Sequence, residues 1–180
     1  MNIESETNSE ITLPSLPERR QKVFDFLAAN DIRYEIIEHP ETPTIELARQ
    51  YWPTDRPIQH CKNLFFRNHK GNRHYLVIMD SERTLDVRRL SALLGERPLS
   101  FASPERMMRY LGVAPGSVSV FGLLNDTANS VSVVLDTKLQ NDLDISFHPN
   151  DNTASLIISH DDFMKTLRLS GNRFKFLPLG

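Results

Sequence analysis

Two neighbouring apolar segments constrain the fold more than any other part of this chain. Residues 61–67 read CKNLFFR and residues 73–79 read RHYLVIM. Both are rich in β-branched and aromatic residues, which is typical of strands. The residues between them, NHKGN, are polar apart from Gly71, a residue that readily adopts the positive φ of a tight turn. The pattern therefore predicts a β-hairpin.

One lysine is set into the first of these strands. Successive side chains of a strand point to opposite faces. One face is expected to carry Lys62, Leu64 and Phe66, and the other Cys61, Asn63 and Phe65. Lys62 and Cys61 are therefore not expected to point into the same cleft. A lysine among apolar side chains is costly unless an anionic group meets it, which makes Lys62 a candidate binding residue. The pattern alone allows equally that Lys62 is a surface lysine whose stem covers apolar neighbours.

The rest of the chain predicts further helices and strands. Helical spacing and capping residues indicate helices over 17–30, 44–52, 86–94, 103–112 and 159–169. Short apolar runs bounded by turn residues indicate strands over 33–37, 118–124, 131–135, 144–147, 155–158 and 174–177. Because the strands mostly come in pairs, with helices between the pairs, the pattern favours an α/β (α+β-like) fold. Its sheet is expected to be mixed or largely antiparallel with helices packed on it, and a doubly wound fold is disfavoured.

Length and composition predict an ordinary globular protein. The chain has 180 residues, 39% of them hydrophobic, and a formal net charge of −2. We expect a mobile tail over residues 1–15, which are acidic and polar, and one domain over 16–180. No segment has the length and apolarity of a membrane span, and the N-terminus lacks the features of a signal peptide. We therefore expect a cytoplasmic protein, and separately we expect a monomer.

Several classes of chemistry lack their motifs here. The chain has no phosphate-binding glycine loop, no dinucleotide fingerprint, no HExxH and no GxSxG. The single cysteine excludes a disulfide framework and a cysteine-rich zinc site, and the six histidines are scattered. We therefore expect neither a cofactor nor a metal. The negative net charge argues against broad coating of nucleic acid, so a nucleic-acid ligand would have to touch a local basic patch such as Lys62, Arg67, Lys70 and Arg73.

Three segments together carry a family resemblance. They are CKNLFF at 61–66, APGSVSVFGLLND at 114–126 and ISFHPNDNTA at 145–154. In this order they resemble the YbaK/ProX-type aminoacyl-tRNA deacylases, the superfamily that includes the editing domain of bacterial prolyl-tRNA synthetases. The strings KNLFL, PGSVSPFGL-ND and FHP-N-T are typical of the branch of free-standing Ala-tRNA(Pro) deacylases. The resemblance covers about residues 20–170.

The resemblance implies a trans-editing hydrolase with a barrel-like, largely antiparallel sheet flanked by helices. The implied reaction is hydrolysis of the ester that joins a mischarged amino acid to the 3′-terminal adenosine of tRNA, with Ala-tRNA(Pro) as substrate. The protein would grip only the acceptor end of tRNA. The catalytic residues implied are Lys62, Gly116, Ser117 and His148. The substrate-binding residues expected are Asn63, Leu64, Val118, Val120 and Phe121.

Roles follow for each of these groups. Lys62 is expected to hold the terminal phosphate or adenosine, and Asn63 to support the neighbouring backbone. The amides around Gly116 and Ser117 are expected to stabilise the oxyanion. His148 is expected to orient the ribose or a water molecule, although a ring hydrogen bond at a strand end would also explain it.

One departure from the family pattern, and one cysteine, leave alternatives open. Val120 stands where the branch usually has proline, which would stiffen the backbone beside the pocket, so the amino-acid specificity is open. The alternatives are deacylation of Cys-tRNA(Pro) or of a serine- or threonine-charged tRNA, and a non-catalytic module that binds aminoacyl-tRNA or a nucleotide. Cys61 as a nucleophile is a further alternative, but a lone buried thiol is more often an inert core residue.

Overall fold

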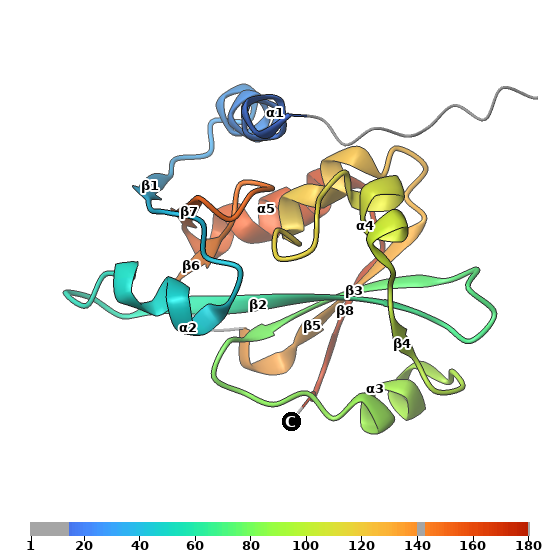
Figure 1. Ribbon diagram of the computed structural model, residues 1–180. Coiled ribbons are helices and arrows are strands. Elements are labelled where there is room, and N and C mark those ends of the chain that lie inside the picture. Colours follow the sequence, from blue (N-terminus) through green and yellow to red (C-terminus); the bar gives the residue numbers. More distant parts are fainter. Residues whose placement is uncertain (1–14, 140–142, 180) are drawn as a thin grey trace, which may run out of the picture.

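One mixed β-sheet of eight strands organises the computed structural model, which describes residues 15–139 and 143–179 (Figure 1). The strands are β1 (Glu35–Glu38), β2 (Ile58–Arg67), β3 (His74–Asp80), β4 (Ser100–Phe101), β5 (Val131–Asp136), β6 (Asp144–Phe147), β7 (Ala154–Ile158) and β8 (Phe174–Leu177). They follow the order β1-β7-β6-β2-β3-β5-β8, with β4 pairing with β2 beside this path. Parallel pairs (β2–β6, β3–β5, β5–β8) occur beside antiparallel ones (β1–β7, β2–β3, β2–β4, β6–β7), which confirms the mixed sheet. The expected tail lies, except for Ser15, outside the described residues.

The helices begin and end close to the predicted positions. They are α1 (Leu16–Ala29), α2 (Ile45–Ala48), α3 (Val87–Leu94), α4 (Pro104–Leu111) and α5 (His160–Ser170), with 3₁₀ turns η1 (Arg49–Tyr51), η2 (Val120–Asn125) and η3 (Thr137–Leu139). Three of these helices end in the same way. Each is followed by a glycine in the left-handed (αL) conformation, which glycine adopts without steric cost. These glycines are Gly95, Gly112 and Gly171.

The predicted hairpin is confirmed as the β2–β3 pair. Its antiparallel register runs from Cys61 opposite Asp80 to Arg67 opposite His74. In the turn, the Asn68 side chain accepts hydrogen bonds from the amides of Asn72 and Arg73, each at 3.1 Å.

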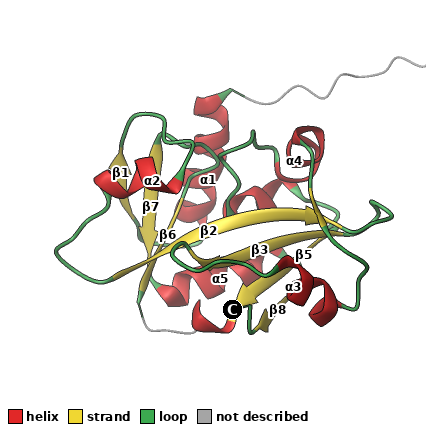
Figure 2. Ribbon diagram, turned by 60° about the horizontal axis from the view of Figure 1, so that its bottom comes forward, coloured by secondary structure: helices red, strands yellow, loops and turns green. Residues whose placement is uncertain are grey.

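The two faces of this hairpin contribute to two separate cores, as strand alternation requires. Phe65, Leu76 and Ile78 belong to a large cluster that takes in residues of α1, α4 and α5. Phe66, Val77 and Met79 belong to a smaller cluster with Leu90 of α3. Figure 1 shows this arrangement, with α1, α4 and α5 on one side of the central strands and α3 on the other, and Figure 2 shows the same elements turned so that the α3 side comes forward.

One predicted strand is wrong. Residues 118–124 do not pair in the sheet, and most of them form the 3₁₀ turn η2. The Ser119 hydroxyl accepts a hydrogen bond from the amide of Phe121, and the Ser119 carbonyl accepts one from Gly122, so this serine caps a helical turn. An apolar run of this length suits a buried turn as well as a buried strand, and local pattern does not distinguish the two.

Candidate active site

The central strand β2 has an opening along one edge. On that edge it pairs with β6 through Ile58–His60 and with β4 through Phe66–Arg67. In the described part of the chain, no strand pairs with the edge between these two stretches. This places the CKNLF segment beside an opening in the sheet.

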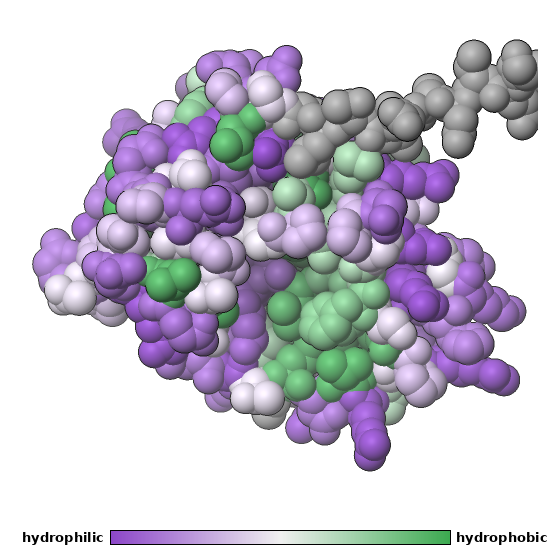
Figure 3. All heavy atoms as spheres, viewed as in Figure 1, coloured by the Kyte–Doolittle hydropathy of each residue, from purple (hydrophilic) through white to green (hydrophobic). Residues whose placement is uncertain are grey.

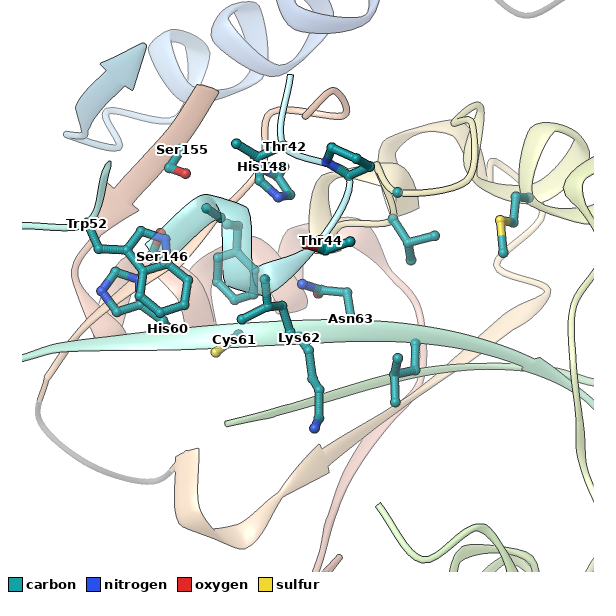
Figure 4. A pocket seen from close by; sticks show the side chains of 18 of the residues that line it. Thr42, Thr44, Trp52, His60, Cys61, Lys62, Asn63, Ser146, His148 and Ser155 are labelled. Atoms are coloured by element: carbon teal, nitrogen blue, oxygen red, sulfur yellow. The ribbon is translucent and has the colours of Figure 1, made fainter. Parts of the chain in front are cut away.

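A cavity of about 280 Å³ lies at this opening (Figure 4). It brings together residues from all three segments that carry the family resemblance. They are Cys61, Lys62, Asn63 and Leu64 from the first segment, Gly116 and Val118 from the second, and Ser146, Phe147 and His148 from the third. The α2 region adds Thr42, Pro43, Thr44, Ile45, Ala48 and Trp52, and His60, Phe101, Met107 and Ser155 complete the lining.

The cavity does not touch every residue that the sequence placed in it. Ser117, Val120 and Phe121 are buried but are not among the lining residues. Val120 and Phe121 belong to the large core cluster, because η2 turns them inward. The Val120 departure from the usual proline therefore lies in the core and not on the cavity wall.

Lys62 and Asn63 extend to opposite sides of β2 (Figure 4). The Lys62 ammonium donates a hydrogen bond to the carbonyl of Arg83, while Asn63 extends toward Thr44. The expected alternation along β2 is thus present. The cavity lining nevertheless includes both Lys62 and Cys61, because the cavity lies at the strand edge, where atoms of both faces are accessible.

In the turn before η2, the backbone amides of Gly116 and Ser117 differ in their hydrogen bonding. Gly116 has a φ of +84°, and a Cβ built on it would lie 3.6 Å from the Asn152 amide nitrogen and 3.7 Å from Pro43. Its own N–H makes no hydrogen bond within the described residues. The Ser117 amide, in contrast, donates to the carbonyl of Ala114 at 3.1 Å. Gly116 is therefore the better placed of the two amides to bind a substrate oxygen.

His148 is held in one tautomer. Its Nδ1 lies 2.8 Å from the carbonyl of Ala154, and since a carbonyl only accepts, Nδ1 carries the proton. Burial lowers the pKa of His148, with a smaller lowering from the neighbouring His39. The ring is therefore neutral at pH 7, and Nε2 has a free lone pair.

The loop that follows His148 is anchored by a buried carboxylate. Asp151 is fully buried and forms an ion pair with Arg20 of α1, and it also accepts hydrogen bonds from the amide and hydroxyl of Thr153. Burial alone would raise the pKa of Asp151, but these hydrogen bonds lower it overall. The loop is tied to the α2 region as well, because the Thr42 amide donates to the Asn152 carbonyl at 2.9 Å. These contacts fix the position of His148 relative to the cavity.

The Cys61 thiol is poorly suited to attack a substrate. Burial raises its pKa well above the ordinary value, so the nucleophilic thiolate is scarce at neutral pH. Cys61 is therefore better explained as an inert core residue than as a nucleophile.

Part of the cavity wall has no sequence signal. It is formed by Thr42, Thr44, Trp52 and His60, of which the sequence places only Thr44 and Trp52 in an element, the helix over 44–52. In the structure the rings of Trp52 and His60 stack at 3.7 Å between centroids, and burial lowers the pKa of His60 to about 4. No local motif marks these residues, because they reach the cavity through tertiary packing.

Neither a membrane span nor a cluster of metal-ligating side chains occurs in the described residues. None of the described helices has the length and apolarity needed to cross a bilayer. The same residues contain no group of three or more histidine, cysteine or acidic side chains that could hold a metal ion.

Comparison with known proteins gives one consistent result. A family model described as an aminoacyl-tRNA editing domain matches residues 39–166. The chain is 38% identical over 160 residues to the prolyl-tRNA editing protein ProX of Acetoanaerobium sticklandii, a match that covers 89% of this chain and 97% of that protein. It is 31% identical to the prolyl-tRNA synthetase associated domain-containing protein 1 of Mus musculus, over 86% of this chain and 93% of that protein. A crystal structure described as that of a candidate trans-editing enzyme for prolyl-tRNA synthetase has a similar fold, with a TM-score of 0.68 at 24% identity over 92% of this chain and all of that one.

Proposed function

Because the chain belongs to the aminoacyl-tRNA editing domain family, we propose that it is a trans-editing deacylase of mischarged tRNA(Pro), with Ala-tRNA(Pro) as its main substrate. The observation that carries this proposal is the convergence of three remote motif segments on one cavity at the open edge of β2. We further propose that residues 16–180 act as a single cytoplasmic editing domain.

The residues of this cavity suit ester hydrolysis. An aminoacyl ester is already activated, so positioning of the carbonyl, a water molecule and the adjacent ribose hydroxyl supplies most of the barrier reduction. The free amide of Gly116 stabilises the developing oxyanion in this proposal. His148, neutral and with Nε2 unprotonated, accepts a hydrogen bond from the water or the ribose hydroxyl and orients it.

Lys62 acts outside the hydrolytic centre in this scheme. Its ammonium lies on the opposite side of β2 from Asn63, where it donates to a backbone carbonyl. A lysine that exchanges this carbonyl for a phosphate oxygen would hold the 3′-terminal nucleotide while the ester crosses the edge of β2 into the cavity. This is consistent with the positioning role expected from the sequence.

Size provides the basis of selectivity. A synthetase site built for proline discriminates weakly against smaller alanine, since each missing methylene is worth about 1–3 kcal/mol. A small second cavity corrects this error by admitting alanine and excluding proline sterically. Leu64 and Val118, both on the cavity wall, are the proposed determinants.

A deacylation panel tests this proposal. Purified protein is incubated with tRNA(Pro) charged with alanine, proline or cysteine and with serine- and threonine-charged tRNAs, and release of the amino acid is followed. We expect rapid hydrolysis of Ala-tRNA(Pro), with Pro-tRNA(Pro) spared. Preference for another charged tRNA would reassign the substrate, and binding without turnover across the panel would make the protein a non-catalytic module.

Two variants in the same assay test the residue roles. Lys62→Ala is expected to abolish deacylation, because the terminal nucleotide is no longer held. Cys61→Ser, the matched control on the neighbouring position, is expected to retain nearly full activity. Full activity of Lys62→Ala would remove Lys62 from the mechanism, and an inactive Cys61→Ser would restore the thiol as a candidate nucleophile.

A further inference from the structure

Phe101 is an exposed aromatic residue on the wall of the cavity. It is 61% exposed, the most exposed large hydrophobic residue of the described chain. Its ring stacks on the buried Phe66 at 4.5 Å between centroids. In the face shown in Figure 3, an apolar patch lies over the region where Figure 1 places β2, β4 and α3, with hydrophilic side chains around it. A phenylalanine this exposed gains little from folding, so a ligand is the better explanation for its position.

The register of the sheet places Phe101 on the same face as Lys62. Phe101 and Phe66 are direct partners in the antiparallel β2–β4 pair, and direct partners point to the same face. Phe66 in turn shares its face of β2 with Lys62 and Leu64 by strand alternation. The ring and the ammonium group therefore lie on one side of the strand, while Asn63 extends to the other (Figure 4).

Positive charge lies in the segments that precede Phe101 in the chain. A second cavity, about 610 Å³, is lined by Lys70, Arg73 and Arg97, with Glu96 as its one carboxylate. That carboxylate is already paired with Arg73. Arg97 precedes Phe101 by four residues, a reach of at most about 14 Å. An exposed aromatic ring with Lys70 and Arg97 in the same part of the chain is a combination that suits single-stranded nucleic acid, which needs a base-stacking surface and cations for its backbone.

From this arrangement we propose that Phe101 is the platform on which the adenine of the 3′-terminal nucleotide stacks. This inference rests on the proposed function and adds a binding residue to it. With adenine on Phe101 and the preceding phosphate at Lys62, the ribose lies over the open edge of β2. The aminoacyl ester then enters the cavity on the other side, where Gly116 and His148 face it.

Two variants and two ligands isolate the stacking contact. Phe101→Leu keeps an apolar side chain without a ring, and Phe101→Trp keeps a ring. The ligands are 3′-alanylamido-3′-deoxyadenosine, a non-hydrolysable mimic of the charged terminus, and its counterpart that lacks the base. We expect Phe101→Leu to weaken binding of the adenosine compound about 10-fold and to leave binding of the abasic compound unchanged, since a base stacked on an aromatic ring contributes about 1–3 kcal/mol. Phe101→Trp is expected to bind both compounds like the parent protein.

Other results would overturn the inference. Equal losses for the two ligands would mean that Phe101 supports the local structure and does not contact a base. Unchanged binding in Phe101→Leu would mean that adenine lies elsewhere. The deacylation panel, run in parallel, distinguishes failure of the two proposals. A parent protein that cleaves no charged tRNA contradicts the proposed function. The binding comparison tests the role of Phe101 independently of turnover.

Discussion

His148 has one ring nitrogen fixed by the backbone and one free for chemistry. The Nδ1–H group donates to the carbonyl of Ala154, which leaves Nε2 as an acceptor. Burial lowers the pKa of His148 below the ordinary value of 6.5, so the acceptor form persists to mildly acidic pH. An imidazole usually gains a proton close to pH 7, but the surroundings of His148 keep its ring uncharged at that pH.

This environment predicts a specific pH dependence. Deacylation by the parent protein, corrected for spontaneous hydrolysis, should be constant as pH falls toward 6.5 and should decrease only as pH passes through the lowered pKa of His148. His148→Gln should lose about 100-fold in kcat/KM, because loss of the orientation of the water or ribose hydroxyl costs about that much, and should lack this acidic limb. A variant that retains the same limb would show that another group titrates. Single-turnover rates from pH 5 to 8 make the comparison.

At the scale of elements, the contact between α4 and η2 depends on one glycine. A Cβ built on Gly122 would lie 2.9 Å from Leu111 Cβ and 3.2 Å from the Leu111 carbonyl oxygen. The carbonyl belongs to the helix backbone, which cannot move aside as a flexible side chain can. The turn that carries Gly116 leads directly into η2, so this packing also supports the cavity wall.

Gly122→Ala is therefore expected to lower the free energy of unfolding by about 1–3 kcal/mol, the usual cost of overpacking. Urea denaturation measures this change. Gly95→Ala is the comparison variant, because a Cβ at Gly95 meets no atom within 4 Å and the cost there comes from its φ of +66°. A Gly122→Ala protein as stable as the parent would show that η2 and α4 shift apart without penalty.

For the whole molecule, neutral histidines whose pKa is lowered in the fold couple stability to pH. Burial lowers the pKa of His60 to about 4, and burial together with the nearby Arg106 and Arg109 lowers that of His74 to about 4. In the unfolded chain both rings titrate near 6.5. Between these values the unfolded state binds more protons, so stability is fully present above pH 6.5 and is lost as pH falls toward 4.

The expected result is a free energy of unfolding that is level from pH 7 to 8 and decreases steadily between pH 6.5 and 4. Urea titrations at intervals of half a pH unit test it. His74→Gln should flatten part of the decrease, whereas substitution of the exposed His69 should leave the curve unchanged. A stability that stays level down to pH 5 would contradict the assignment.

Local patterns account for most elements that were predicted correctly. The hairpin follows from apolar segments that flank a turn at Gly71, and α3 and α4 follow from the cap residues Asp86 and Ser103 with glycine after each helix. These signals act over a few residues, so the sequence alone contains them. The 118–124 segment was predicted wrongly because its conformation depends on the core that covers it.

The sequence by itself also determined which segments carry the family resemblance and that Lys62 and Asn63 occupy opposite faces of one strand. Only the tertiary structure decided that the cavity opens at the edge of β2, since that opening results from pairing with β6 and β4, which lie about 30 to 90 residues away in the chain. The same non-local contacts moved Val120 and Phe121 into the core and brought Thr44, Trp52 and Phe101 to the cavity. Such residues have no sequence signal because their positions depend on packing between distant segments.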